Sequence, residues 1–399
     1  MPKLTLDQLD LKGKRVLVRV DFNVPLKVNE DGTRTVTDDT RIRAALPTIR
    51  HILQAGGSAI LMSHLGRPKD GPDPPFSLKP VAAHLENVLG RPVHFSEALT
   101  GPEAQAAVDR LKEGGVLLLE NTRFVAGEKK NDDALAAEMA ALADVYVNDA
   151  FGSAHRAHAS TEAVAHHMPQ AAMGYLLQRE VEYLSRVLEA PDHPFVAVLG
   201  GAKVSDKINL IENLLDKVDA ILIGGAMSYT FLKALGTPVG SSRVEEDRLD
   251  VARAVYEKAA GKINLPTDHI VAPAFDNDAP RSTVSGAIPD GQMGLDIGPE
   301  TVNAYREILL KARTVVWNGP MGVFEMPNFA KGTFAVADTL AETTKNGALT
   351  VVGGGDSVAA ITQAGLDDAV SHVSTGGGAM LEFLEGKTLP GVAALTEAG

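Results

Sequence analysis

The sequence has 399 residues, of which 45% are hydrophobic and 22% are charged, the composition of a soluble globular protein that is too long for one ordinary core. Its net charge of −13 argues against nucleic acid and anionic membranes as partners. It contains no cysteine, which excludes disulfides, thiolate metal sites and a cysteine nucleophile.

In the first half of the chain, short apolar strands alternate with helical patterns. Strands are expected at 15–20, 58–62, around 93, 116–120 and 145–147, and helices at 40–54, 79–89, 102–112 and 132–143. Nearly continuous apolar strands in this alternation predict a parallel sheet covered on both faces. Ligands of such sheets bind at the carboxyl ends of the strands.

The segment 174–189 has the pattern of one amphipathic helix, which a Pro-containing segment at 190–194 ends. A second series of strands is expected after it, at 195–199, 220–223, 269–272, 314–317, 349–352 and 372–374. The predicted fold is therefore α/β, with two Rossmann-like doubly wound domains, mainly parallel sheets and a hinge helix. The expected domains are 1–173 with the C-terminal tail from about 388 to 399, the hinge 174–190, and 191–387.

Polar and basic residues follow four strands of the first half. These are Asp21 and Asn23, His64 and Arg67, Arg123, and the run His155 to His158, and Arg41 begins the first helix. A single arginine is most often a solvated surface charge. Three arginines at equivalent strand ends of an acidic protein indicate instead a small anion with several charges, because arginine binds carboxylate and phosphate in a bidentate manner.

Histidines alone do not make a metal site here. The candidates are His155, His158, His166 and His167. A metal site is disfavoured because no cysteine and no carboxylate at ligand spacing accompany them, and because the neighbouring arginine repels a cation.

Glycine-rich turns follow strands of the second half. The run Gly353 to Ser357 leads into a helix, and Ser374 to Ala379 repeats the pattern one strand later. Glycines also serve as helix caps and turns, but two triple-glycine loops at consecutive strand ends indicate a bound nucleotide. Asp356 is placed to help hold a Mg²⁺ that bridges phosphates. A nicotinamide dinucleotide is disfavoured because its G-x-G-x-x-G fingerprint is missing from the strand-to-helix turns.

Seven motifs occur in one order along the chain. They are Arg19-Val20-Asp21-Phe22-Asn23-Val24-Pro25, Ser63-His64-Leu65-Gly66-Arg67-Pro68, Glu120-Asn121-Thr122-Arg123-Phe124, Asp149-Ala150-Phe151-Gly152-Ser153-Ala154-His155-Arg156, Leu199-Gly200-Gly201-Ala202-Lys203-Val204, Trp317-Asn318-Gly319-Pro320 and Gly353-Gly354-Gly355-Asp356-Ser357. Over essentially its whole length, the chain closely resembles the phosphoglycerate kinase family.

The resemblance implies two sets of site residues. The first domain would bind 3-phosphoglycerate or 1,3-bisphosphoglycerate through Asp21, Phe22, Asn23, Arg41, His64, Leu65, Gly66, Arg67, Arg123 and Arg156. The second would bind Mg²⁺ with ATP or ADP through Gly201, Lys203, Lys207, Gly294, Asn318, Glu325, Gly354, Gly355, Asp356 and Ser357, with Asp356 towards the metal. The implied catalytic residues are Arg41, Lys203 and Gly377. Gly200 and Gly201 would let the backbone approach the nucleotide.

The implied reaction is transfer of a phosphoryl group from 1,3-bisphosphoglycerate to MgADP. The reverse nucleophile is a carboxylate, which is ionised at neutral pH, so that no general base is needed. We expect direct in-line transfer after hinge closure, in a cytoplasmic monomer. The alternatives are an inactive homologue, although every expected catalytic position is occupied, and a two-domain anion-binding protein, although residues 1–7 lack the pattern of an export signal.

Overall fold

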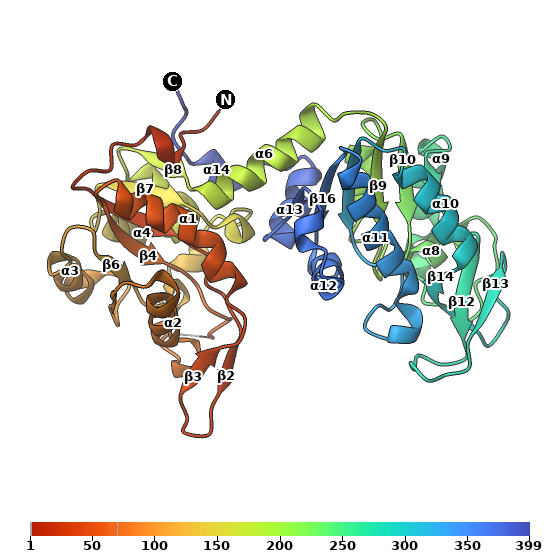
Figure 1. The fold of residues 1–399 in the computed structure, drawn as a ribbon, viewed down its shortest axis with the longest axis horizontal. Coiled ribbons are helices and arrows are strands. Elements are labelled where there is room, and N and C mark those ends of the chain that lie inside the picture. Colours follow the sequence, from red (N-terminus) through yellow and green to blue (C-terminus); the bar gives the residue numbers. More distant parts are fainter. Residues whose placement is uncertain (1, 70) are drawn as a thin grey trace. The chain divides into compact units, whose positions relative to one another are not determined.

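The computed structural model describes residues 2–69 and 71–399 (Figure 1). The chain separates into two compact units: unit 1 consists of Met1–Glu182 and Thr388–Gly399, and unit 2 of Tyr183–Lys387. Helix α6 (Tyr175–Glu189) contains the point at which the chain passes from unit 1 to unit 2. No helix among the described residues is both long enough and apolar enough to cross a membrane.

Unit 1 is built on a sheet of six parallel strands. In spatial order these are β5 (Val93–Phe95), β6 (Val116–Leu118), β4 (Ser58–Met62), β1 (Arg15–Arg19), β7 (Val145–Asn148) and β8 (Ala171–Met173). Arg19 pairs with Met62 on one side and with Asn148 on the other, so that β1, β4 and β7 end at one edge. This register brings the polar residues that follow the three strands to the same edge of the sheet.

Helices cover both faces of this sheet. They are α1 (Thr40–Gln54), α2 (Lys79–Leu89), α3 (Gly101–Asp109), α4 (Asp133–Ala140), the short α5 (Val164–His166) and α14 (Pro390–Ala393), and a hairpin of β2 (Leu26–Val28) and β3 (Arg34–Val36) extends from the unit (Figure 1). Alternate residues of β1 take part in one core cluster, where Val16 and Val18 share it with Ile42 and Ile49 of α1. Both faces of the strands are buried, which accounts for their nearly continuous apolar sequences.

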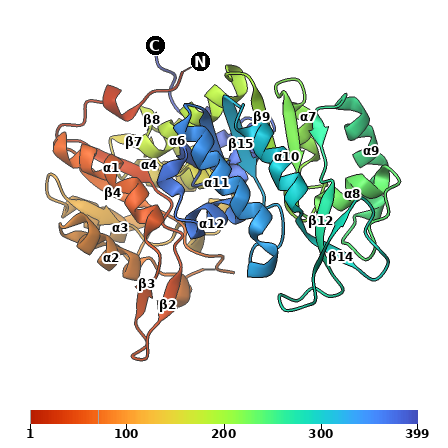
Figure 2. The same cartoon turned by 45° about the vertical axis from the view of Figure 1, so that its right-hand side comes forward.

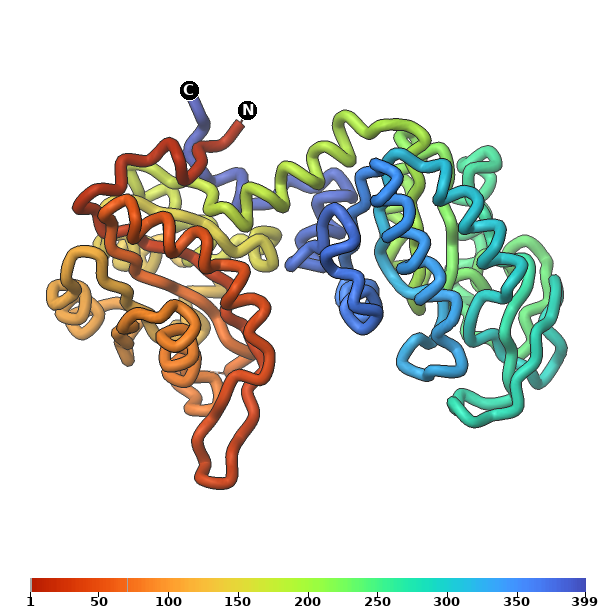
Figure 3. Tube along the Cα trace, in the orientation of Figure 1, coloured from red at the N-terminus to blue at the C-terminus, as the bar shows by residue number. Residues whose placement is uncertain are grey.

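The two ends of the chain lie side by side in unit 1 (Figure 3). The Leu4 amide donates to the Thr396 carbonyl at 2.8 Å, and the Ala398 amide donates to the Pro2 carbonyl at 2.9 Å. The last residues of the chain are therefore part of the unit that the first residues begin.

Unit 2 repeats the six-stranded parallel sheet. The spatial order is β11 (Ile263–Asn264), β10 (Ala220–Ile223), β9 (Phe195–Leu199), β15 (Thr314–Asn318), β16 (Leu349–Gly353) and β17 (His372–Val373). Its helices are α7 (Ile208–Leu214), α8 (Met227–Ala234), α9 (Leu249–Lys258), α10 (Pro299–Leu309), α11 (Lys331–Lys345), α12 (Gly355–Gln363) and α13 (Gly377–Leu384). Figure 2 shows α10 and α11 side by side over one face of the sheet, where Tyr305 and Leu340 belong to the same core cluster as the buried Trp317. The predicted fold, two α/β units with mainly parallel sheets, is confirmed.

One predicted strand was placed in the wrong sheet. We expected 269–272 to continue the parallel series, but β12 (Asp268–Ala272) lies at the centre of a separate antiparallel sheet between β13 (Ser282–Ser285) and β14 (Met293–Ile297). Only residues 265–267 separate β12 from β11, and a parallel connection needs a crossover of a dozen or more residues. The short link leaves no room for that crossover.

Candidate active site

The edge of unit 1 brings five of the predicted substrate residues into direct contact with a partner from that set. Arg41 Nη1 lies 2.9 Å from Asp21 Oδ2. Asn23 Oδ1 accepts a hydrogen bond of 2.8 Å from the Gly66 amide, and Arg123 Nη1 donates to the Gly66 carbonyl at 2.5 Å. The ends of β1 and β4 and the residues after β6 are thus tied together, as expected for parallel strands that share one edge.

Two residues that the sequence reasoning did not single out support this edge. Asn121 Oδ1 accepts from the amides of Leu65 (3.2 Å) and Arg123 (3.0 Å), and its Nδ2 donates to the Leu65 carbonyl at 2.8 Å. Ser63 Oγ accepts from the Phe22 amide at 2.8 Å. Both are buried polar residues inside the quoted motifs, and a buried polar side chain directly after a strand is the signal that could have identified them.

Cationic groups gather around a neutral histidine at this edge. Burial holds the pKa of His64 well below its usual value, and the charges of Arg19, Arg123 and Arg156 lower it further although Asp21 opposes them. Burial, together with Arg156 and Arg19, also lowers the pKa of Arg123 to about 10. Glu128 and Asp21 balance part of this positive charge, and the buried Arg123 Nε still has no hydrogen-bond partner among the described residues, so that the cluster can bind a further anion.

The remaining predicted residues of unit 1 are less tightly held. Arg156 is half-buried, and its Nε lies 3.2 Å from His155 Nε2. Arg67 is exposed and makes no hydrogen bond within the described part of the chain. Burial alone would raise the pKa of Asp21, but the charges of Arg41 and Arg19 and the hydrogen bond from the Asn23 amide hold it below its usual value. The edge as a whole can bind a small anion with several charges.

In unit 2, the loops after β9 and β15 pack backbone against backbone. The Gly201 amide donates to the Pro320 carbonyl at 3.1 Å, and a Cβ on Gly200 would lie 2.0 Å from that same oxygen. The contact between the loops is therefore one reason for glycine at position 200, and close approach to a nucleotide stays a prediction. Gly201 has φ +111° and open space where a Cβ would be, and it lines a cavity.

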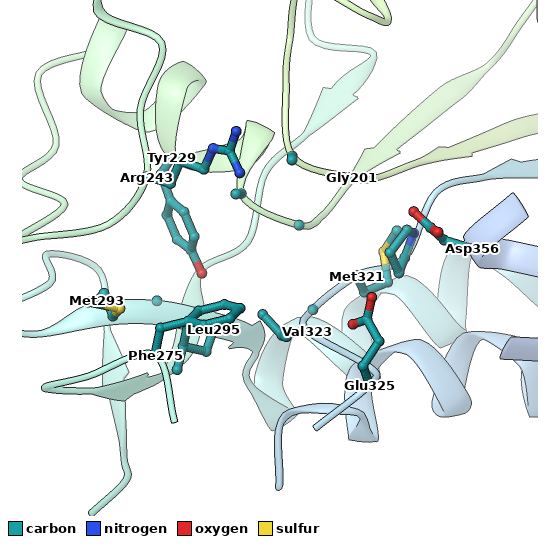
Figure 4. A pocket seen from close by; sticks show the side chains of 16 residues that line it. Gly201, Tyr229, Arg243, Phe275, Met293, Leu295, Met321, Val323, Glu325 and Asp356 are labelled. Atoms are coloured by element: carbon teal, nitrogen blue, oxygen red, sulfur yellow. The ribbon is translucent and has the colours of Figure 1, made fainter. Parts of the chain in front are cut away.

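This cavity has a volume of about 470 Å³, within the usual range for a small-molecule site. Four predicted nucleotide residues line it: Gly201, Gly294, Glu325 and Asp356. Figure 4 shows Glu325 and Asp356 at one side and Tyr229, Arg243 and Phe275 at the other. The sequence reasoning missed the aromatic side, because Tyr229 and Phe275 lie outside every glycine-rich motif.

The polar side of unit 2 collects groups from three strand ends. Lys207 Nζ donates to Asn318 Oδ1, and burial lowers the pKa of Lys207. Asn318 is almost fully buried, and its Nδ2 has no hydrogen-bond partner among the described residues. Ser357 Oγ accepts from the Gly319 amide at 2.5 Å, which ties α12 to the loop after β15. Unused donors and a half-buried lysine are suited to bind a phosphate group.

The two triple-glycine loops touch each other. A Cβ on Gly377, the first residue of α13, would lie 3.1 Å from Gly354 Cα. Gly355 and Asp356 form the first turn of α12, whose N-terminal amides favour an anion. The carboxylates of Asp356 and Glu325 line one cavity, and carboxylate oxygens are the ligands that Mg²⁺ prefers. This donor set fits a magnesium ion held with a nucleotide.

Lys203 differs from Lys207 in its surroundings. It is exposed and makes no hydrogen bond within the described residues. Its loop is anchored two residues further on, where Ser205 donates to Glu245 through its hydroxyl (2.6 Å) and its amide (3.1 Å). The ε-amino group of Lys203 is therefore free to contact a ligand.

Comparison with known proteins identifies the family to which the chain is similar. The family model described as phosphoglycerate kinase matches residues 6–387. The chain is 61% identical over 398 residues to the phosphoglycerate kinase of Salinibacter ruber, and 57% identical over 404 residues to that of Chloroflexus aurantiacus, with full coverage of both chains in each case.

Solved structures give the same result. The phosphoglycerate kinase of Coxiella burnetii matches with a TM-score of 0.89 and 44% identity, and that of Pyrococcus horikoshii with a TM-score of 0.84 and 34% identity. Each match covers 98% of both chains. With a family model that matches most of its length and relatives that match all of it, the chain belongs to the phosphoglycerate kinase family.

Proposed function

We propose that the protein catalyses the reversible reaction of 1,3-bisphosphoglycerate with MgADP to give 3-phosphoglycerate and MgATP. The observation that carries this proposal is the cluster of Arg19, Arg123 and Arg156 around the neutral His64, in a protein whose net charge is −13. Such a cluster needs an anion with several charges, and the phosphate and carboxyl groups of phosphoglycerate supply them.

In unit 1, the phosphoglycerate molecule would be held by side chains from several strand ends. Asp21 and Asn23 position Arg41 and the loop 64–67, since each makes a direct hydrogen bond there. Arg123 and Arg156 supply charge for the phosphate. Arg41 has its guanidinium paired only with Asp21 among the described residues, so that several donors remain for the reacting group.

In unit 2, the nucleotide would occupy the cavity described above. The base would lie at the aromatic side, near Tyr229 and Phe275, and the phosphates near Lys207 and the first turn of α12. Asp356 would hold a Mg²⁺, which when bound neutralises charge on the nucleotide phosphates. Ser357 and Asn318 keep the surrounding loops in place through hydrogen bonds.

The chemistry requires charge stabilisation and alignment rather than proton transfer. The acceptor carboxylate of 3-phosphoglycerate is already ionised at neutral pH. Lys203 and Arg41 would stabilise the phosphoryl group in flight, with help from the backbone amide of Gly377 at the start of α13. No covalent intermediate with the enzyme is needed.

The two proposed sites belong to different units, and transfer requires that their ligands meet. We propose that the units close about α6 when both substrates are bound, and that closure excludes water from the acyl phosphate. Small-angle scattering should show a smaller radius of gyration with both ligands than with either one. An unchanged radius would contradict the proposed closure.

A coupled assay tests the function itself. Formation of ATP from 1,3-bisphosphoglycerate and ADP should occur with Mg²⁺ and stop when the metal is chelated. An inactive protein that still binds phosphoglycerate would contradict the proposal, and it would indicate the anion-binding or inactive alternative. We propose further that the enzyme acts in the cytoplasm as a monomer, and sedimentation at several protein concentrations tests the oligomeric state.

A further inference from the structure

Four buried polar side chains of unit 1 form a continuous chain of hydrogen bonds that ends at His64. Glu128 is fully buried and accepts two hydrogen bonds from Ser160, from its hydroxyl at 2.6 Å and from its amide at 2.9 Å. Ser160 Oγ in turn accepts from Arg19 Nε at 2.8 Å. Arg19 Nη2 lies 3.1 Å from His64 Nδ1. None of the four side chains is more than 6% exposed.

The chemistry of these groups fixes the direction of every bond. A guanidinium has donors only, so that His64 Nδ1 must be the acceptor and carries no proton. The Ser160 hydroxyl has one hydrogen, which it donates to Glu128, while its lone pair accepts from Arg19. His64 is neutral, since burial keeps its pKa well below its usual value. Its single ring proton therefore lies on Nε2.

The surroundings leave little freedom for another arrangement. The Tyr146 hydroxyl donates to the Ser160 carbonyl at 2.9 Å, which holds the backbone of that residue. His158 Nδ1 lies 3.9 Å from Glu128 Oε1, and burial lowers the pKa of His158 to about 4, so that it is neutral and leaves the carboxylate to Ser160. Arg19 also donates to the Val20 carbonyl, which fixes the other side of the guanidinium.

We propose that Glu128 and Ser160 are positioning residues which, by holding Arg19 in place, fix the tautomer of His64 so that its Nε2–H can donate to an anionic oxygen of phosphoglycerate. The inference rests on the proposed function, because it takes phosphoglycerate as the ligand of His64. Nε2 has no hydrogen-bond partner among the described residues, whereas Nδ1 is occupied by Arg19. The other tautomer would face Arg19 with a second donor and would turn a lone pair towards the anion, which is unfavourable on both sides.

Ser160→Ala is the sharpest test, because it removes the hydroxyl that joins Glu128 to Arg19 and changes the side-chain volume little. We expect the ring ¹⁵N signals of His64 in the ligand-free variant to move from the pattern of the Nε2–H tautomer towards a mixture of the two tautomers. A His64→Gln spectrum assigns these signals among the 11 histidines. The dissociation constant of 3-phosphoglycerate should rise about 10-fold, the lower end of what losing an outer partner costs at metal sites.

Two further variants separate this role from general stability. Ser96→Ala removes another buried serine hydroxyl of unit 1, which donates to the Ala98 carbonyl at 2.9 Å, and should change neither the His64 signals nor the affinity. In Glu128→Gln, the amide oxygen can accept from the Ser160 hydroxyl, but the amide nitrogen cannot accept from the Ser160 N–H. The His64 ring signals and the dissociation constant of 3-phosphoglycerate in this variant should therefore lie between those of Ser160→Ala and those of the unaltered protein.

The spectrum of the unaltered protein already tests the inference, even where a variant does not fold. A proton on Nδ1 of His64, or a charged ring at neutral pH, overturns it. So does an unchanged tautomer in a folded Ser160→Ala variant, or a changed tautomer with unchanged affinity for 3-phosphoglycerate. Failure of the proposed function would be recognised separately, because the unaltered protein would then form no ATP in the coupled assay, whether or not it bound 3-phosphoglycerate, while its His64 spectrum stayed as expected.

Discussion

Lys203 and Lys207 lie four positions apart but differ in burial, and separate alanine variants should therefore fail in different ways. Lys203 is exposed without a hydrogen bond among the described residues, so Lys203→Ala should leave the melting temperature within about a degree. If Lys203 stabilises the phosphoryl group in flight, its removal should lower kcat about 10²–10³-fold, as for the loss of one donor at an oxyanion site. The affinity for MgADP should change little.

Lys207→Ala should show the opposite pattern. Lys207 is half-buried and donates to Asn318 Oδ1, so its removal leaves a buried acceptor without a partner, at a cost of about 1–3 kcal/mol. For a unit of this size, that corresponds to a fall in melting temperature of roughly 2–12 °C. The affinity for MgADP should weaken, because the charge that we propose binds the phosphates is lost.

Three measurements together distinguish the roles of Lys203 and Lys207. They are steady-state kinetics in the direction of ATP formation, isothermal titration with MgADP, and thermal melting. The reasoning is refuted if Lys203→Ala weakens MgADP binding while kcat is kept. It is equally refuted if Lys207→Ala melts at the temperature of the unaltered protein and binds MgADP normally. Because each variant serves as the control for the other, a general loss of positive charge cannot produce both patterns.

Three further variants test other parts of the molecule. Gly200→Ala places a Cβ 2.0 Å from the Pro320 carbonyl, so it should lower the stability by about 1–3 kcal/mol and weaken MgADP binding. The control Gly347→Ala, at φ +93° with open space around it, should leave MgADP binding intact. Thermal melting and titration with MgADP measure both variants. Arg123→Lys keeps the charge but loses the planar guanidinium, so KM for 3-phosphoglycerate should rise at least about 10-fold while KM for the nucleotide stays the same. Burial raises the pKa of Asp296 from 3.8 to about 7. Between these two pH values the native state keeps a proton that the unfolded state has lost, so the free energy of unfolding should fall as the pH rises from about 4 to 7. This group should contribute a fall of about 4 kcal/mol at most. Denaturant unfolding at several pH values should show this slope, and Asp296→Asn should flatten it; an equal slope in both proteins would contradict the assignment.

The polar edge of unit 1 could be predicted because its residues directly follow strands. Parallel strands end at one edge, so that Asn23, Gly66 and Arg123 come together although they are far apart in the sequence. The two glycine loops of unit 2 were predictable for the same reason, since β16 and β17 are neighbours. In both cases a local pattern and one topological rule were sufficient.

Other features depend on contacts that no local pattern contains. β12 is apolar enough for a parallel strand, and only the length of its link to β11 shows that it belongs elsewhere. Tyr229 reaches the cavity from α8, and a Cβ on Gly294 would lie 2.1 Å from its hydroxyl, a contact between two segments 65 positions apart. Glu128 meets Ser160 across 32 positions, and Ser160 meets Arg19 across 141. Such pairs follow from packing, which sequence periodicity does not specify.

The meeting of the two chain ends bears on the order in which the protein is made. Residues 183–387 are one continuous stretch, but unit 1 also needs Thr388–Gly399, where the Gly391 carbonyl accepts from Asn148 Nδ2 at 3.0 Å at the end of β7. During synthesis from the N-terminus, unit 2 can finish folding before unit 1 has its last segment. Unit 1 therefore becomes complete only after Thr388–Gly399 leave the ribosome, and a chain that stops before them would lack part of unit 1, which we propose binds phosphoglycerate, while unit 2 was whole.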